Sequence, residues 1–236
     1  MDGKSNTGEN FERMYDQQPS GEGILGLLVD YYLLKMPSVQ MAINRKERLK
    51  KIILSEKIKV GDADLMVLDL ASGSSRYSIE AAVQSGGGIR FFCVDKDPFQ
   101  LMIGRHKAEK LGVSHMFEYR NANVFDCSVF EDVKPDLTIS SGLTVYHDDT
   151  GLKDHLELVS SNVPRLSKFV VDNQIMNPSA NLMEKLAKQD DGNPWALHYR
   201  TREVFEEKVR KYFRINNSYV DKVGMIHMVE AVPREK

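Results

Sequence analysis

The stretch Val67–Tyr77 has the residue types of a site that binds a nucleotide-like ligand. It begins with an apolar run, continues through the small residues Ala71–Ser75 and enters a helical pattern at Arg76. Small residues let the backbone approach a ligand closely, and a helix N-terminus offers backbone N–H groups that have no partner within the helix. The stretch therefore predicts a ligand-binding turn, although a tight strand-to-helix turn without a ligand has the same pattern.

Two familiar nucleotide motifs do not fit this stretch. A dinucleotide fingerprint needs glycine at its first and third positions and Gly or Ala at its sixth, where this chain has Ala71, Gly73 and Arg76. A Walker loop needs Gly-Lys followed by Ser or Thr after four spacer residues, and the sequence has none. The pattern therefore argues against NAD-dependent chemistry and against phosphoryl transfer.

A second chemical signal is Asp95, which ends the apolar run Ile89–Val94 beyond Gly73. An acidic side chain about twenty residues after such a turn can accept hydrogen bonds from both hydroxyls of a ribose. The alternative is that Asp95 caps the helix that begins near Pro98, but Asp97 is itself a good cap. We therefore expect Asp97 to cap the helix and Asp95 to bind ribose.

Alternating strand and helix patterns must position these residues. Strands are expected at Leu65–Leu70, Ile89–Val94, Ser114–Tyr119, Asp136–Ser140, Lys168–Asp172, Arg214–Val220 and Met225–Val232. The first five runs are mostly apolar and alternate with helical patterns, which is typical of a parallel sheet covered on both faces. The last two are joined by Asp221–Gly224, which is too short for a helical crossover, so they are expected to pair as an antiparallel hairpin at the sheet edge.

Helical patterns occur before the first strand and between the later ones. They cover Ile24–Leu34, Ser38–Lys57, Arg76–Val83, Gly151–Asn162 and Thr201–Tyr212, with a further helix after Asp97. In that further helix Phe99, Met102, Ile103 and His106 share one face, which predicts a buried face and a core position for His106. His227 is likewise expected in the core. The basic run Arg45–Lys51 is expected to form a solvated helix face, with an anionic partner such as RNA or lipid headgroups as the alternative.

Composition narrows the class of protein. The 236 residues carry 32 basic and 34 acidic side chains, so the formal net charge is −2 and nucleic acid is not an expected partner. Cys93 and Cys127 are expected to be reduced core thiols, and no cluster has the spacing of a metal site. The N-terminal residues lack the pattern of a secretory signal, and no apolar run is long enough to cross a bilayer. We therefore expect a cytoplasmic protein with no metal and no membrane segment.

These motifs together resemble those of class I S-adenosylmethionine-dependent methyltransferases. The resemblance covers about residues 60 to 235 and rests on VLDLASGSSRY, FFCVDKDP, Asn121–Asp126, PDLTISSGL and the terminal hairpin. A narrower resemblance, to a putative methyltransferase family sometimes fused to an α/β-hydrolase domain, rests on Ala71–Gly73 with Arg76-Tyr77, on Ser141–Leu143, and on Asp191–Trp195 followed by Arg200-Thr201. The implied fold is Rossmann-like α/β, with seven mostly parallel strands and an antiparallel last strand. Residues 1–58 would form a tail and helical cap, and residues 59–236 the cofactor-binding domain.

The resemblance also implies roles for individual residues. Asp69 and the backbone of Ala71–Ser74 would meet the methionine part of S-adenosylmethionine, Asp95 its ribose, and Asn123 with Val124 its adenine. Family members often have Asp in place of Asn123, whose amide oxygen can still accept a hydrogen bond from the adenine amino group. The full set expected around the cofactor is Asp69, Ala71, Ser72, Gly73, Ser74, Arg76, Tyr77, Asp95, Lys96, Asn123, Val124, Ser140, Ser141 and Gly142.

The acceptor side is expected after the fourth strand, since α/β sheets bind ligands at the carboxyl ends of their strands. Tyr146 and His147 are the catalytic candidates, although a loop histidine beside two aspartates is more often part of a solvated cluster. The residues expected to contact the acceptor are Tyr15, Asn173, Gln174, Trp195, His198 and Tyr199. For Trp195 the alternative is a core anchor.

The expected function is methyl transfer from S-adenosylmethionine to a small molecule, with S-adenosylhomocysteine as the product. One alternative is a cyclase or aminocarboxypropyl transferase that releases methylthioadenosine. The other is a non-catalytic module that keeps the cofactor pocket and docks RNA through Arg45–Lys51. A monomer and a homodimer both remain open.

Overall fold

A computed structural model describes residues 15–16, 19, 23–178 and 197–234. Its helices are α2 (Gly23–Leu34), α3 (Pro37–Val60), α4 (Arg76–Ser85), α5 (Pro98–Lys110), α6 (Asp149–Asn162) and α8 (Arg202–Arg210). Its strands are β1 (Leu65–Leu70), β2 (Ile89–Asp95), β3 (Phe117–Asn121), β4 (Leu137–Ser140), β5 (Lys168–Gln174), β6 (Phe213–Val220) and β7 (Ile226–Pro233). Trp195, one of the predicted acceptor contacts, lies outside the described residues.

The strands form one seven-stranded sheet in the order β3-β2-β1-β4-β5-β7-β6. Strands β1 to β5 are parallel, and β7 runs antiparallel to both of its neighbours. From β1 the chain first builds the sheet on one side, through β2 and β3, and then on the other, through β4 and β5. The carboxyl ends of β1 and β4 therefore flank the switch point, which is where open α/β sheets bind ligands. The predicted mostly parallel sheet with a reversed last strand is confirmed, with β7 lying inside the sheet and β6 at its edge.

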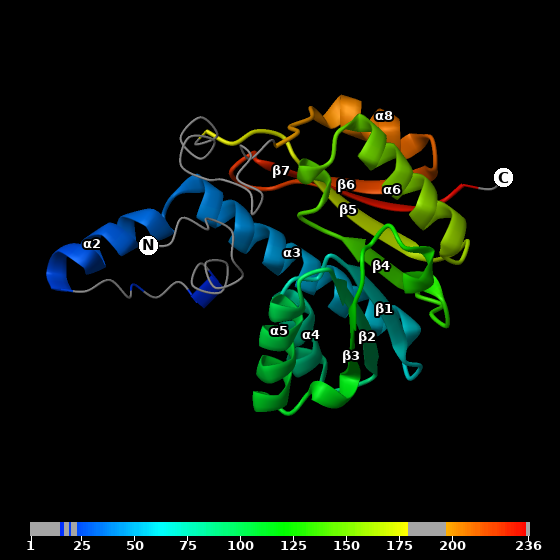
Figure 1. Ribbon diagram of the computed structural model, residues 1–236, viewed down its shortest axis with the longest axis horizontal. Coiled ribbons are helices and arrows are strands. Elements are labelled where there is room, and N and C mark those ends of the chain that lie inside the picture. Colours follow the sequence, from blue (N-terminus) through cyan, green and yellow to red (C-terminus); the bar gives the residue numbers. More distant parts are fainter. Residues whose placement is uncertain (1–14, 17–18, 20–22, 179–196, 235–236) are drawn as a thin grey trace.

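Helices cover both faces of the sheet (Figure 1). On one face α6 and α8 bury Leu152, Leu156 and Phe205 against strand residues such as Leu68 and Val171. On the other face α3 and α4 pack on the sheet, and their core contains Leu49, Ile53, Ala82, Val67 and Ile139. Because α3 belongs to this core, a separate cap in residues 1–58 remains a prediction for the part of the chain that precedes α3.

The basic run on α3 is not a solvated face. Lys46 Nζ lies 2.7 Å from Glu80 Oε1 and is only 8% exposed, while Arg48 Nη2 lies 2.7 Å from Glu230 Oε1. Lys50 Nζ lies 3.2 Å from Glu80 Oε2. The expectation of a solvated face is therefore wrong for Lys46, Arg48 and Lys50, because these three cations bind α3 to α4 and β7 and are not free for RNA or lipid headgroups.

Three local expectations also need correction. Helix α5 faces the sheet with Leu101, Gly104 and Ala108, whereas Phe99, Met102 and His106 are exposed. Ser114–Met116 forms a short 3-10 helix, so the third strand begins only at Phe117. Both cysteines are free, but Cys127 is exposed and only Cys93 lies in the core. His227 is fully buried, as expected.

Helix α2 differs from the rest of the described chain because it exposes most of its apolar residues and projects away from the sheet (Figure 1). Ile24, Leu25 and Tyr32 are 81%, 76% and 74% exposed. Within the described residues no helix combines the length and hydropathy needed to cross a membrane.

Candidate functional site

The turn between β1 and α4 is held in a left-handed backbone conformation. Ala71, Gly73 and Ser75 have φ values of 59°, 54° and 54°. Residues with a Cβ seldom adopt this conformation, which costs of order 1–3 kcal/mol each and persists where the surroundings enforce it. The turn is tied to β2 because Ser72 N donates to Val94 O over 3.0 Å. Such a strained turn at the end of the first strand places its backbone amides at the start of α4.

Asp97 caps α5 as the sequence predicts, whereas the ribose contact of Asp95 stays a prediction. The Asp97 carboxylate accepts from Phe99 N over 2.9 Å and caps α5. Asp95 Oδ2 accepts from Gly73 N over 2.8 Å, and Asp95 Oδ1 from Asp97 N over 2.9 Å. Burial raises the pKa of Asp95. Each oxygen of this carboxylate has a second acceptor position, so Asp95 can bind the strained turn and a ligand at the same time.

Asp69 lies behind the turn and is fully buried. It accepts hydrogen bonds from Tyr77 Oη and, over 2.9 Å, from Ser78 Oγ. Burial raises the pKa of Asp69 to about 7. The observed contacts therefore anchor the first turns of α4, and direct contact between Asp69 and the methionine part stays a prediction.

A close approach by α5 supports the turn from outside. A Cβ on Gly104 would lie 2.8 Å from Ser74 O and 3.3 Å from the Tyr119 ring. Only glycine allows this contact without a shift of backbone atoms. Gly104 is thus a positioning residue for the turn, and the sequence pattern did not single it out.

The predicted adenine side lies where β3 ends. Asn123 Oδ1 accepts from Phe125 N over 3.1 Å, while Val124 is buried. The Phe125 ring meets the His147 ring edge-on at 5.0 Å between centroids. Burial, together with the charge of Lys96, lowers the pKa of His147, so its imidazole is neutral near pH 7. His147 therefore lies beside the predicted adenine position, and Lys96 is close enough to influence it.

Beyond β4 the chain is fixed to β5 by Asp172. Gly142 N donates to Asp172 Oδ1 over 2.8 Å, and Ser141 Oγ donates to Asp172 Oδ2. Thr144 Oγ1 donates to Asp172 O over 2.6 Å. These contacts give Ser141 and Gly142 a defined position at the carboxyl edge. The sequence did not identify Asp172 because it reads as the last residue of a buried strand.

Ser140 faces the opposite way from a ligand at this edge. Its hydroxyl lies 2.9 Å from His155 Nε2, and both residues are buried. Burial lowers the pKa of His155 to about 4, so the imidazole is neutral in the folded protein. A cofactor contact by Ser140 can therefore involve only its backbone.

Arg200 organises the predicted acceptor side. Its Nη2 donates to His147 O over 2.6 Å, its Nη1 to Thr144 O over 3.2 Å, and its Nε to Asp149 Oδ1 over 3.0 Å. Asn173 Nδ2 donates to Arg200 O over 2.7 Å, and Arg200 N donates to Gln174 O over 3.4 Å. One buried guanidinium thus joins segments that lie more than fifty residues apart in the sequence, and no local pattern indicates it.

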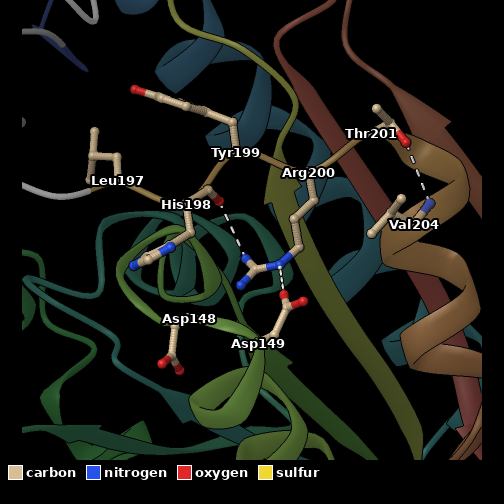
Figure 2. Close-up of a pocket in the computed structure, with 8 residues that line it drawn as sticks. All are labelled: Asp148, Asp149, Leu197, His198, Tyr199, Arg200, Thr201 and Val204. Atoms are coloured by element: carbon tan, nitrogen blue, oxygen red, sulfur yellow. Dashed lines mark hydrogen bonds and ion pairs between the residues drawn. The ribbon is translucent and has the colours of Figure 1, made fainter.

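A cleft of about 750 Å³ opens beside this cluster (Figure 2). Its lining is formed by Asp148, Asp149, Leu197, His198, Tyr199, Arg200, Thr201 and Val204. In Figure 2 the Arg200 side chain extends toward Asp149, His198 lies on the side of Asp148, and Tyr199 points away from both. His198 and Tyr199 therefore belong to the lining of one cleft, and Asn173 and Gln174 bind the adjoining Arg200 backbone, while their contact with an acceptor stays a prediction. In the described part of the chain no group of His, Cys, Asp and Glu could hold a metal ion.

The described N-terminal residues lie over the start of α4. Asp16 Oδ1 is 2.8 Å from Arg76 Nη2, whose Nε is 2.8 Å from Glu80 Oε1. Tyr15 lies near Arg45 and beneath Lys46, whose Nζ is 5.7 Å from the Tyr15 ring centroid. Arg76 is therefore bound by two carboxylates, and Tyr15 packs beside two cations of α3.

Comparison with solved structures identifies the fold. A possible exported protein from Bordetella parapertussis superposes with a TM-score of 0.75 at 14% identity, covering 98% of this chain and 80% of that one. Magnesium protoporphyrin IX methyltransferase from Synechocystis PCC 6803, solved with bound S-adenosylhomocysteine, gives 0.68 at 12% identity, with 98% and 96% covered. The strand order, the reversed β7 and the strained turn define a class I methyltransferase fold.

The sequence comparison adds the family. The family described as "putative methyltransferase" matches residues 2–232, so the chain belongs to it. The chain is also 22% identical over 241 residues to the uncharacterized protein YnbC of Escherichia coli (strain K12). That match covers 97% of this chain and 40% of YnbC, so the chain spans about two fifths of this relative.

Proposed function

We propose that the protein transfers a methyl group from S-adenosylmethionine to a small-molecule acceptor. The observation that carries this proposal is the pairing of the strained Ala71–Ser75 turn with the Asp95 carboxylate at the end of the neighbouring strand. Family membership and the class I fold support the same conclusion. The Synechocystis methyltransferase was solved with the product of such a reaction bound.

The residues at the turn fit this cofactor. A Cβ on Gly73 would meet no other atom of the described residues within 4 Å, so this side of the turn is open. Asp95 would accept hydrogen bonds from the ribose hydroxyls, and Asn123 with Val124 would border the adenine. The polar wall beyond β4 would then face the other end of the cofactor.

When bound, S-adenosylmethionine supplies a methyl group on a sulfonium centre, which a nucleophile can displace in line. The chain contributes orientation, since holding reactants in the attack geometry accounts for much of such a rate enhancement. A base is needed only if the acceptor arrives protonated. Tyr146 and His147 remain the candidates, and the neutral imidazole of His147 is in the form that accepts a proton.

Neither alternative function is favoured by an observation. A cyclase or aminocarboxypropyl transferase would release methylthioadenosine, whereas methyl transfer releases S-adenosylhomocysteine, so product analysis separates them. The RNA-docking module relied on Arg45–Lys51, but Lys46, Arg48 and Lys50 are ion-paired within the protein. A small-molecule acceptor, rather than a nucleic acid, is therefore the proposed partner.

Calorimetric titration with S-adenosylhomocysteine tests the pocket. Asp95→Ala should weaken binding roughly 10-fold to 100-fold, because hydrogen bonds to a charged group contribute about 1.5–3 kcal/mol. Asp97→Ala is the matched control, since this neighbouring carboxylate caps α5. It should lower the free energy of unfolding by about 1 kcal/mol and leave the affinity unchanged.

Two results would contradict the proposal. The first is absence of binding to the wild-type protein shown to be folded by circular dichroism. The second is equal loss of affinity in Asp95→Ala and Asp97→Ala, which would trace the effect to the loop as a whole rather than to a ribose contact.

A further inference from the structure

Arg45 reaches the carboxyl edge of the sheet from α3. Its Nη1 lies 2.9 Å, and its Cζ 3.3 Å, from the position that a Cβ on Gly142 would take. Gly142 has a φ of 74° and follows Ser141, the first residue after β4. The guanidinium therefore lies against the backbone at the point where β4 ends.

Arg45 differs from the other cations of its helix. Lys46, Arg48 and Lys50 each have a carboxylate partner, whereas no carboxylate of the described residues forms an ion pair with Arg45. The carboxylate whose charge acts on Arg45 is Asp172, and its two oxygens already accept from Ser141 and Gly142. The positive charge at this edge thus lacks a dedicated anion.

The surroundings keep Arg45 charged. Burial lowers the pKa of Arg45, but the nearby oxygens of Tyr15 and Asp172 outweigh burial and raise it. Tyr146 acts in the same direction. A half-buried guanidinium without a carboxylate partner is costly to maintain. A ligand carboxylate would supply the missing partner, and the guanidinium fork can bind it through two hydrogen bonds.

The order of the strands indicates which part of the ligand arrives there. In the sheet β3 and β2 lie on one side of β1, and β4 lies on the other. Asp95 ends β2 and Asn123 follows β3, so the nucleoside half of the proposed cofactor belongs on that side. A ligand extended across the turn after β1 then brings its amino acid half to β4, where Arg45 lies.

We propose that Arg45 binds the carboxylate of the methionine portion of S-adenosylmethionine, together with the backbone at Gly142. This inference rests on the proposed function, because it assumes that the cofactor lies across the Ala71–Ser75 turn. A carboxylate on the acceptor is the same chemistry from a second source, and the experiment separates the two.

The test compares two probes in calorimetric titrations: S-adenosylhomocysteine, and its decarboxylated analogue, which keeps the adenosine and the amine. The wild-type protein should bind S-adenosylhomocysteine more tightly than the analogue. Arg45→Met should weaken binding of S-adenosylhomocysteine roughly 10-fold to 100-fold and leave binding of the analogue unchanged. Arg45→Lys should recover part of the loss because it keeps the charge without the fork.

Lys51→Met is the matched control, since Lys51 is an exposed residue of the same helix. It should change neither affinity, and the thermal unfolding of all variants shows that they are folded. Equal weakening of both probes by Arg45→Met would overturn the inference, since Arg45 would then support the site without reading a carboxylate.

If Arg45→Met leaves binding of both probes unchanged but raises the KM for the acceptor, Arg45 binds a carboxylate of the acceptor and not of the cofactor. This result would overturn the assignment. Absence of binding of either probe to the wild-type protein would instead contradict the proposed function itself. The two failures are therefore distinguishable.

Discussion

Two arginines reach the carboxyl edge of the sheet from opposite ends of the chain, and their surroundings differ. Arg200 is 5% exposed at its side chain, pairs with Asp149 and donates to the carbonyl oxygens of Thr144, His147 and His198. Arg45 has no carboxylate partner among the described residues. Arg200 thus stabilises the fold, because the protein itself supplies the partners of its charge. Arg45 is available to a ligand, because the described residues supply no carboxylate for it.

The largest expected effect on stability comes from replacing Arg200, the arginine whose hydrogen bonds and ion pair lie within the protein. Arg200→Met should lower the free energy of unfolding by about 3 kcal/mol or more, because it leaves buried carbonyl oxygens without donors. Urea unfolding at neutral pH measures this. Arg45→Met should change the same quantity by less than about 1 kcal/mol, since replacing an unmatched charge by an apolar side chain removes little protein–protein interaction.

Lys208→Met is the control on the Arg200 side, because Lys208 pairs with the same Asp149 at 2.8 Å but is more exposed. Loss of this ion pair should lower the free energy of unfolding by about 1 kcal/mol or less. Similar destabilisation in Arg45→Met and Arg200→Met would contradict the distinction between the two regions.

An intermediate effect concerns pH and the buried His155 beneath β4. The folded pKa of about 4 lies below the unfolded value of 6.5, so the unfolded chain takes up the proton first as the pH falls. The stability contribution of neutral His155 is therefore fully present above pH 6.5 and is lost between pH 6.5 and about 4, by about 3 kcal/mol in all.

Urea unfolding across this pH range measures the slope. His155→Leu should be less stable at pH 7, since Ser140 loses its partner, but its stability should fall less steeply below pH 6.5. His106→Gln, at an exposed position, is the control and should keep the wild-type slope. An identical slope in His155→Leu would show that other groups carry the acid response.

The smallest expected effect concerns Glu80, which pairs with Lys46 and Lys50 of α3 and so holds the helix that carries Arg45. Burial raises the pKa of Glu80, but hydrogen bonds from Lys46 and Arg76 outweigh it and lower the pKa to about 2. This depressed pKa contributes stability that is present above the unfolded value of 4.5 and is lost as the pH falls toward 2.

Glu80→Gln should therefore lower the free energy of unfolding by about 1 kcal/mol at pH 7, after allowance for solvent screening. The difference from wild type should vanish as the pH falls from 4.5 toward 2. Glu157→Gln, which removes an exposed pair with Lys153, is the control and should have almost no effect. A constant difference at all pH values would exclude the charge of Glu80 as its cause.

Local rules predicted the turn after β1 and the cap of α5. Asp97 before Pro98 has the pattern of a helix cap, and the structure confirms that it caps α5 and leaves Asp95 to the turn. The turn itself was recognisable because small residues follow an apolar strand. In both cases the deciding interactions join residues close in the sequence or at the ends of adjacent strands.

The same rules failed where packing depends on distant residues. Helix α5 shows apolar periodicity through Phe99 and Met102, yet its contact face is set by Gly104, because a small residue allows close approach to Ser74. The basic run on α3 predicts a solvated face, but Lys46 and Arg48 pair with Glu80 and Glu230, which lie far along the chain. Charge pattern alone does not show whether a cation faces solvent or a carboxylate.

By itself, the amino-acid sequence determined the alternation of strands and helices, the reversed hairpin, the small-residue turn and the acid at the end of β2, because each depends on residue type and short spacing. Only the tertiary structure decided which arginine is satisfied and which is not. That property depends on the distances among α3, β4, β5 and the segment that ends at Arg200, and these distances are set by packing of the whole sheet.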